Sequence, residues 1–102
     1  RGIYSTIYIQ LKELQGLDIH DLYNSFYKDS PNVSIMRTGK VPDIKSIANT
    51  NNCHISVNYS NIENQVIVIS SIDNLVKGAA GQAVECYNLM HGFSQRTGLG
   101  NG

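Results

Sequence analysis

The sequence predicts an α+β domain that has a mixed, largely antiparallel sheet with helices packed on one face. Residues 3–11 and 53–72 carry the alternating or continuous apolar patterns of strands. Two separate stretches, after Asp18 and after Asp73, instead carry the helical period. The predicted order along the chain is β-α-β-β-β-β-α with short links between most strands, which is typical of the α+β class. This order does not by itself indicate a function.

The first predicted strand covers residues 3–11. Its odd-numbered residues are apolar except for Ser5, whereas its even-numbered residues are tyrosines, a threonine and a glutamine. Because successive side chains of a strand point to opposite faces, this alternation gives the strand one apolar face.

A helix is predicted after Asp18, which stands in the position of an N-cap. Apolar residues then recur at the spacing i, i+3, i+4 and i+7, as Ile19, Leu22, Tyr23 and Phe26. The helix should end before Pro31, because proline cannot continue it. Residues 33–36 are then a short strand candidate, residues 39–42 a predicted loop, and residues 44–48 are predicted to be extended.

The clearest hairpin pattern lies in residues 53–72. Alternate residues of its first strand share one apolar face, and they are Cys53, Ile55, Val57 and Tyr59. Residues 60–64 form the turn, and residues 66–72 return. The return strand is apolar on both faces over residues 66–69, which indicates a central strand covered on both sides.

A final helix is predicted after Asp73, which would cap it. Its apolar residues follow the helical period, as Val76, Ala80, Ala83, Val84 and Tyr87. Gly78 and Gly81 each cost about 1 kcal/mol inside a helix, so we expect a closely packed neighbour, which we assign to a further domain of a longer chain. The domain is predicted to cover residues 1–93, ending near Phe93, and residues 94–102 to form a flexible tail.

Composition and charge exclude several classes of partner. Eight basic and eight acidic residues cancel within 102 residues, so the net charge supplies no long-range field that would draw the chain to nucleic acid. The longest apolar run, residues 66–69, falls far short of the roughly 20 residues that span a bilayer. Since the N-terminus has no signal-peptide pattern either, we expect a cytoplasmic protein that binds neither nucleic acid nor membrane.

The cysteines and histidines do not form a recognisable site. Cys53 and Cys86 lack the spacing of a paired-cysteine metal site and are expected to be reduced core residues. Cys53 could be the nucleophile of an independent cysteine enzyme, but His54 beside it points to the opposite face of the same strand. The histidines are too scattered for a zinc site, so no metal is indicated.

A recognisable signature lies between Ser71 and Val84, which reads Ser-Ile-Asp-Asn-Leu-Val-Lys-Gly-Ala-Ala-Gly-Gln-Ala-Val. It closely resembles the Asp-Asn-Leu-x-Lys-Gly-Ala-Ala-Gly-x-Ala-Val signature of N-acetyl-gamma-glutamyl-phosphate reductases, with a looser likeness to aspartate-semialdehyde dehydrogenases. Further segments fit the first family in one order along the chain, at residues 1–6, 22–33, 49–53 and 88–93. The Arg-Gly start and the Asn-Asn-Cys turn favour the reductase over its aspartate cousin.

The resemblance implies an NADPH-dependent enzyme of arginine biosynthesis that converts N-acetyl-gamma-glutamyl phosphate into N-acetylglutamate 5-semialdehyde. In such enzymes an upstream Rossmann domain holds NADPH, a cysteine forms a thioester with the substrate, and a histidine acts as acid and base. Those parts precede the matched region, so this chain is expected to hold no catalytic residue and to be inactive alone. The implied fold is that of the C-terminal domain of glyceraldehyde-phosphate and semialdehyde dehydrogenases, which forms homo-oligomers through its sheet.

The resemblance also assigns roles to Arg1 and Asn74. Arg1 stands where the wider superfamily places an arginine that binds the anionic substrate, and the alternative is an ordinary surface arginine. Asn74 is expected beside the nicotinamide, where its carboxamide can donate and accept hydrogen bonds. The alternative for Asn74 is a helix-start residue that satisfies backbone groups.

A different class of protein also fits the pattern. The chain could be a stand-alone α+β interaction or ligand-sensing module, without chemistry, whose sheet dimerises. Lys77 and the glycines after it could be taken for a phosphate-binding loop, but they lack the Walker spacing.

Overall fold

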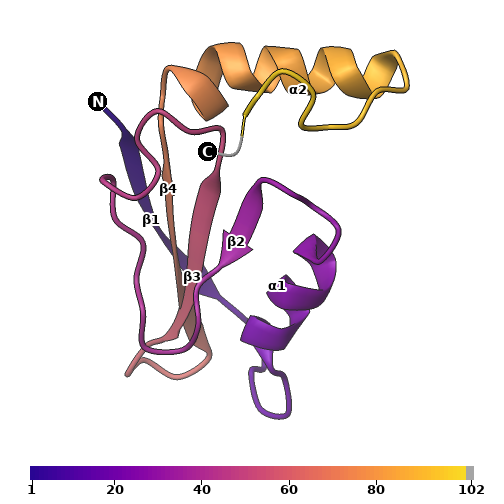
Figure 1. The fold of residues 1–102 in the computed structure, drawn as a ribbon. Coiled ribbons are helices and arrows are strands. Elements are labelled where there is room, and N and C mark those ends of the chain that lie inside the picture. The colour runs from indigo at the N-terminus through magenta and orange to yellow at the C-terminus, as the bar shows by residue number, and fades with distance from the viewer. Residues whose placement is uncertain (101–102) are drawn as a thin grey trace.

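The computed structural model of the chain describes residues 1–100. In chain order, its elements are β1 (Ile3–Gln10), α1 (Ile19–Tyr27), β2 (Val33–Ile35), β3 (Cys53–Tyr59), β4 (Gln65–Ile72), the π-helical turn η1 (Val76–Ala80) and α2 (Gly81–Met90). The strands form a four-stranded sheet in the order β1-β4-β3-β2 (Figure 1).

The sheet is mixed and mostly antiparallel. β4 pairs antiparallel with both β1 and β3, whereas β2 pairs with β3 in parallel. The predicted α+β class and sheet type are therefore confirmed. The position of β4 between β1 and β3 also confirms that the strand with apolar residues on both faces is a central one.

One face of the sheet carries the core. The buried apolar side chains there come from the two central strands, and they are Ile55, Val57, Val66 and Val68. On the edge strand β1, Ile9 packs against this core, as does Leu11 just after the strand, whereas Ile3 and Ile7 are 47% and 48% exposed. The apolar face predicted for the first strand is thus covered over only part of its length.

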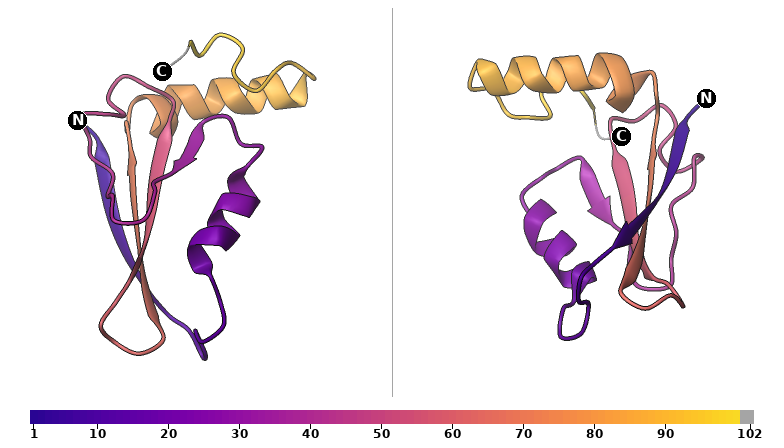
Figure 2. Two further views of the ribbon diagram at one scale, coloured as in Figure 1. Left: turned by 60° about the horizontal axis from the view of Figure 1, so that its bottom comes forward. Right: turned by 180° about the vertical axis from the view of Figure 1, so that it is seen from behind.

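Helix α1 covers this core face (Figure 2) and packs Ile19, Tyr23 and Tyr27 against it. The carboxylate of Asp18 accepts the N–H of Asp21, so the predicted N-cap is confirmed. The helix ends at Tyr27, before Pro31, as the sequence indicated.

The opposite face is partly covered by the long connection between β2 and β3 (Figure 2). The hydroxyl of Ser71 on β4 donates to the backbone oxygen of Asp43, which fixes this connection to the sheet. The prediction that residues 44–48 are extended is wrong, because the N–H groups of Ile47 and Ala48 both donate to the carbonyl of Ile44 in a tight turn. The turn buries Ile47 completely.

The last helix begins differently from the prediction. Asp73 accepts the N–H of Leu75 and so closes the turn before the helix, whereas the helix itself starts at Val76 without a side-chain cap. Its first turn is π-helical, with the N–H of Ala80 donating to the carbonyl of Leu75. The α-helical part, α2, then crosses the end of the sheet rather than lying along a face (Figure 1).

The chain folds back after α2. The N–H of Phe93 donates to the carbonyl of Asn88, which closes the end of the helix near the predicted domain boundary. Beyond it, the side chain of Asn88 donates to the carbonyls of Gln95 and Thr97. The flexibility predicted for residues 94–102 stays a prediction, and residues 101–102 lie outside the described part of the chain.

Candidate functional site

The antiparallel pairing of β1 with β4 brings together two residues that the sequence singled out. Ile3 is paired with Ile72, so the residues just before β1 lie beside the residues just after β4. Arg1 and Asn74 therefore belong to one small cluster at this end of the sheet. Their neighbours are Gly2, Asn49 and Asp73.

Asp73 is the centre of this cluster. Its carboxylate is fully buried and accepts hydrogen bonds from Arg1 Nε at 2.8 Å, from the Asn49 N–H at 2.6 Å and from the Leu75 N–H at 2.8 Å. Burial raises the pKa of this carboxyl, but the two backbone N–H groups and the Arg1 guanidinium outweigh it and hold the pKa below its usual value. Asp73 is therefore a permanent anion at neutral pH.

Arg1 is held by only one of its nitrogens. Its Nε meets Asp73, while its side chain remains 43% exposed. Among residues 1–100, the two terminal guanidinium nitrogens, Nη1 and Nη2, have no hydrogen-bond partner. A carboxylate or phosphate could accept hydrogen bonds from these two nitrogens while Nε stays bound to Asp73.

Asn74 has one half of its carboxamide engaged. Its Oδ1 accepts the backbone N–H of Gly2 at 2.7 Å, so its orientation is set by the start of β1. Among residues 1–100, the Nδ2 donor of Asn74 has no hydrogen-bond partner. Gly2 has a φ of +114°, and an added Cβ there would lie 2.6 Å from Ile44 Cγ2, so a glycine is required for this approach.

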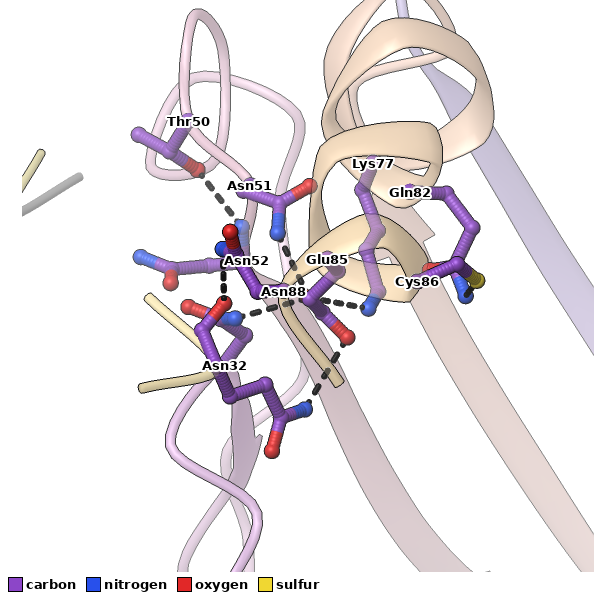
Figure 3. Close-up of polar contacts among 10 residues, drawn as sticks. Asn32, Thr50, Asn51, Asn52, Lys77, Gln82, Glu85, Cys86 and Asn88 are labelled. Carbon is purple, nitrogen blue, oxygen red and sulfur yellow. Dashed lines mark hydrogen bonds and ion pairs between the residues drawn. The ribbon is translucent and has the colours of Figure 1, made fainter. Parts of the chain in front are cut away.

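A second cluster, which the sequence did not reveal, surrounds the buried carboxylate of Glu85 (Figure 3). Donors from separate segments converge on it, namely Asn32 Nδ2, Asn51 Nδ2, Lys77 Nζ and Gln95 Nε2. Burial raises the pKa of Glu85, but hydrogen bonds from Lys77 and Gln95 and the Lys77 charge lower it below the usual value overall. Lys77 is thus paired within the chain.

The prediction that the glycines of the last helix pack against a further domain is wrong at Gly81. A Cβ at Gly81 would collide with Asn51 Oδ1, so the closely packed neighbour of Gly81 belongs to this chain and not to a further domain. Gly78 has only ordinary contacts around it and is exposed. For the exposed residues 78–80, packing against a further domain stays a prediction.

The cysteines and histidines do not converge. Cys53 lies on the core face, and burial raises the pKa of its thiol despite the nearby Lys77 charge. Burial lowers the pKa of His54, which lies on the other face of β3, with the Asp43 charge opposing the shift. Cys86 is exposed on α2, which contradicts its prediction as a core residue. Within residues 1–100, no group of three or more His, Cys, Asp or Glu side chains could hold a metal ion.

Comparisons with known proteins identify the family. The model of the semialdehyde dehydrogenase dimerisation domain matches residues 1–74. The chain belongs to this family. The matched region extends from Arg1 to Asn74 and so contains both residues of the Arg1–Asp73 and Gly2–Asn74 contacts.

Individual relatives of this semialdehyde dehydrogenase domain carry a more specific name. The chain is 46% identical to an N-acetyl-gamma-glutamyl-phosphate reductase of Clostridium botulinum over 100 residues, or 97% of its length. The identity and coverage are the same for the reductase of Bacillus subtilis. The reductase of Listeria welshimeri is 42% identical over 101 residues. The chain spans 29% of the length of each of these relatives.

Sequence analysis singled out Arg1 and Asn74 as candidates but missed how they are held. Asp73 was interpreted as a helix cap, and only the pairing of β1 with β4 shows that it faces Arg1. No sequence pattern indicated the contact between Lys77 and Glu85, because the two residues are eight positions apart and paired residues of a helix are normally three or four apart.

Within residues 1–100, no helix combines the length and the apolar character needed to cross a bilayer.

Proposed function

We propose that this chain is the C-terminal part of an N-acetyl-gamma-glutamyl-phosphate reductase. The complete enzyme reduces N-acetyl-gamma-glutamyl phosphate to N-acetylglutamate 5-semialdehyde in arginine biosynthesis, with NADPH as cofactor, in the cytoplasm. The names of relatives that match 97% of the chain support this proposal. Their greater length leaves room for an upstream Rossmann domain with the catalytic cysteine and histidine.

The Asp73 cluster is the observation that carries the proposal. It contains a guanidinium and a carboxamide, each fixed through a contact with a residue 72 positions away in the chain. Arg1 would bind a carboxylate or phosphate of the substrate, and Asp73 would keep it in place. Neither residue carries out bond breaking, which fits a domain that positions the substrate and cofactor.

Asn74 fits the cofactor because its Nδ2 is a donor that remains beside an anion-binding group. A nicotinamide carries a carboxamide whose oxygen can accept from this donor. NADPH, when bound, supplies the hydride for the reduction. This chain would contribute the orientation of the ring, while most of the cofactor would contact the upstream domain.

The domain would also join copies of the enzyme into a homo-oligomer, as the name of the matched family model implies. β1 lies at the edge of the sheet and exposes Tyr4 and Tyr8 by 46% and 66%, on the face that also carries Ile67 and Ile69. Exposed aromatic side chains beside half-buried apolar ones on a sheet face are typical of a subunit interface. We propose that copies meet through this face.

The test compares the complete polypeptide that carries this chain with the chain alone. With N-acetyl-gamma-glutamyl phosphate as substrate, the complete protein should oxidise NADPH and release phosphate, whereas residues 1–102 alone should show neither reaction. A complete protein that is folded but inactive with this substrate would contradict the proposal and favour an interaction module. Activity of the chain alone would contradict the placement of the catalytic cysteine upstream.

A further inference from the structure

The carboxylate of Glu85 connects parts of the chain that are distant in sequence. Oε1 accepts from Asn32 at 2.7 Å, from Asn51 at 2.6 Å and from Lys77 at 2.9 Å, and Oε2 accepts from Gln95 at 3.0 Å. The residue is only 4% exposed, although it lies on a helix whose other side chains mostly face solvent. A buried carboxylate that accepts hydrogen bonds from several segments fixes those segments relative to one another.

Two of these donors belong to segments that make hydrogen bonds to Asp73. Lys77 belongs to the π-helical turn η1, whose Val76 and Gly78 N–H groups donate to the carbonyl of Asp73. Asn51 belongs to the same short segment as Asn49, whose N–H donates to the carboxylate of Asp73. Glu85 therefore holds both the backbone that follows Asp73 and the loop that satisfies its side chain.

The π-helical turn makes the contact between Lys77 and Glu85 possible. An α-helix advances about 100° per residue, so residues eight apart would differ in direction by about 80°. A π turn has more residues per turn and therefore advances less per residue, which rotates Lys77 toward the face of Glu85. The contact between Lys77 and Glu85 in turn stabilises the π-helical turn, which follows Asn74 closely in the chain.

Asn51 shows how strongly the carboxylate orders its surroundings. Its Nδ2 donates to Glu85, which leaves its Oδ1 buried beside Gly81 with no hydrogen-bond partner among the described residues. Rotating the amide by half a turn would direct Oδ1 at the carboxylate, which is repulsive. Glu85 Oε1, as the acceptor for Asn51 Nδ2, thus fixes the orientation of Asn51 at the cost of an unsatisfied polar atom.

We propose that Glu85 is a positioning residue for Asn74, acting through Lys77 and Asn51 on the turn that presents the Asn74 carboxamide. This inference rests on the proposed role of Asn74 at the nicotinamide. Removing Glu85 would release η1 and the loop at residues 49–51, so the carboxamide would no longer be held in one place. A misplacement of this kind costs up to about 100-fold in the rate of a positioned reaction.

A conservative substitution provides the matched comparison. In Glu85→Gln, Oε1 can still accept from Asn32, Asn51 and Lys77, while Nε2 replaces the oxygen that meets only Gln95, whose amide can rotate to accept. Glu85→Ala removes all of these contacts. Gln82→Ala, one turn away on the exposed side of α2, leaves the cluster intact and is the control.

The experiment uses the complete reductase and measures kcat, the KM of the acyl phosphate and the isotope effect with NADPH deuterated at the transferred hydrogen. Glu85→Ala should lower kcat by about 10- to 100-fold per folded molecule and increase the isotope effect, while the KM of the acyl phosphate changes less than about threefold. Glu85→Gln and Gln82→Ala should stay within about threefold of the parent.

Two results would overturn the proposal. Glu85→Ala could lower the yield or melting temperature while the folded fraction keeps the parental kcat and isotope effect, which would make Glu85 purely structural. Asn74→Ala, measured in parallel, separates this from failure of the proposed function. If Asn74→Ala slows hydride transfer and Glu85→Ala does not, only the positioning role is wrong. If neither does, the cofactor role of Asn74 is wrong as well.

Discussion

Arg1 and Asp73 are 72 positions apart in the chain, yet Nε of the first lies 2.8 Å from Oδ2 of the second. The ion pair joins Arg1, two residues before β1, to Asp73, the first residue after β4, and a hydrogen bond from Gly2 to Asn74 lies next to it. The buried carboxylate therefore orients an exposed cation and leaves its outer nitrogens available. This arrangement supports the proposed role of Arg1 in binding the substrate anion.

The first prediction concerns Asn74 in the complete reductase. Asn74→Ala removes the Nδ2 donor and the acceptor for Gly2, so turnover should fall by one or two orders of magnitude, the scale of a lost positioning contact. Single-turnover measurement of NADPH oxidation checks this. Asn61→Ala, at an exposed turn, is the control. An unchanged rate of hydride transfer in Asn74→Ala would refute the assignment.

Much of the fold could be predicted because it depends on local patterns. The alternation in β3, the continuous apolar run in β4 and the cap at Asp18 each specify one element. The tight turn at residues 44–48 was missed, although Ile44, Ile47 and Ala48 have the i, i+3, i+4 spacing of a helical turn. A segment this short fits both patterns, and the backbone hydrogen bonds from Ile47 and Ala48 to the carbonyl of Ile44 show which one the chain adopts.

The candidate site was predictable only in part. Arg1 and Asn74 followed from resemblance, whereas the contacts that hold them depend on which strands pair. The Glu85 cluster depends in addition on the π-helical turn, which the spacing of residues in the sequence does not predict. Long-range pairing and one irregular turn thus determine the parts that sequence reasoning missed.

The second prediction is a dependence of stability on pH. The pKa of Glu85 in the folded chain lies below its ordinary value of 4.5, so between these two values the unfolded state binds more protons. Stability should therefore rise with pH across this window, and the contribution of Glu85 is lost as the pH falls through the folded pKa. Urea unfolding between pH 3 and pH 7 checks this. Glu85→Gln should give a flatter profile, and an unchanged slope would contradict the ion pair.

The third prediction concerns thiol reactivity. Burial raises the pKa of Cys53, so little thiolate forms near neutral pH, while Cys86 is exposed. Iodoacetamide at pH 7.5 should label Cys86 at least about tenfold faster than Cys53 in the folded chain. Mass spectrometry of timed samples distinguishes the sites. Rapid labelling of Cys53 would instead support the hypothesis of an independent cysteine enzyme.

The fourth prediction compares two glycines. Gly81→Ala places a Cβ against Asn51 Oδ1 and 2.7 Å from the carbonyl of Val76, and such overpacking costs about 1–3 kcal/mol of unfolding free energy. Gly78→Ala meets nothing closer than 3.4 Å and should be neutral or stabilising, since alanine favours the helix. Urea unfolding of both variants checks this. Equal effects would mean that Asn51 does not pack against α2.

The role of Arg1 is tested most directly by the kinetics of Arg1→Ala in the complete reductase, with Arg37→Ala on an exposed segment as the control. If Arg1 binds the substrate anion, the KM of N-acetyl-gamma-glutamyl phosphate should rise about tenfold or more, the scale of one lost charge-assisted hydrogen bond, while the dissociation constant of NADPH stays the same. An unchanged KM, or an effect on NADPH binding alone, would contradict the account.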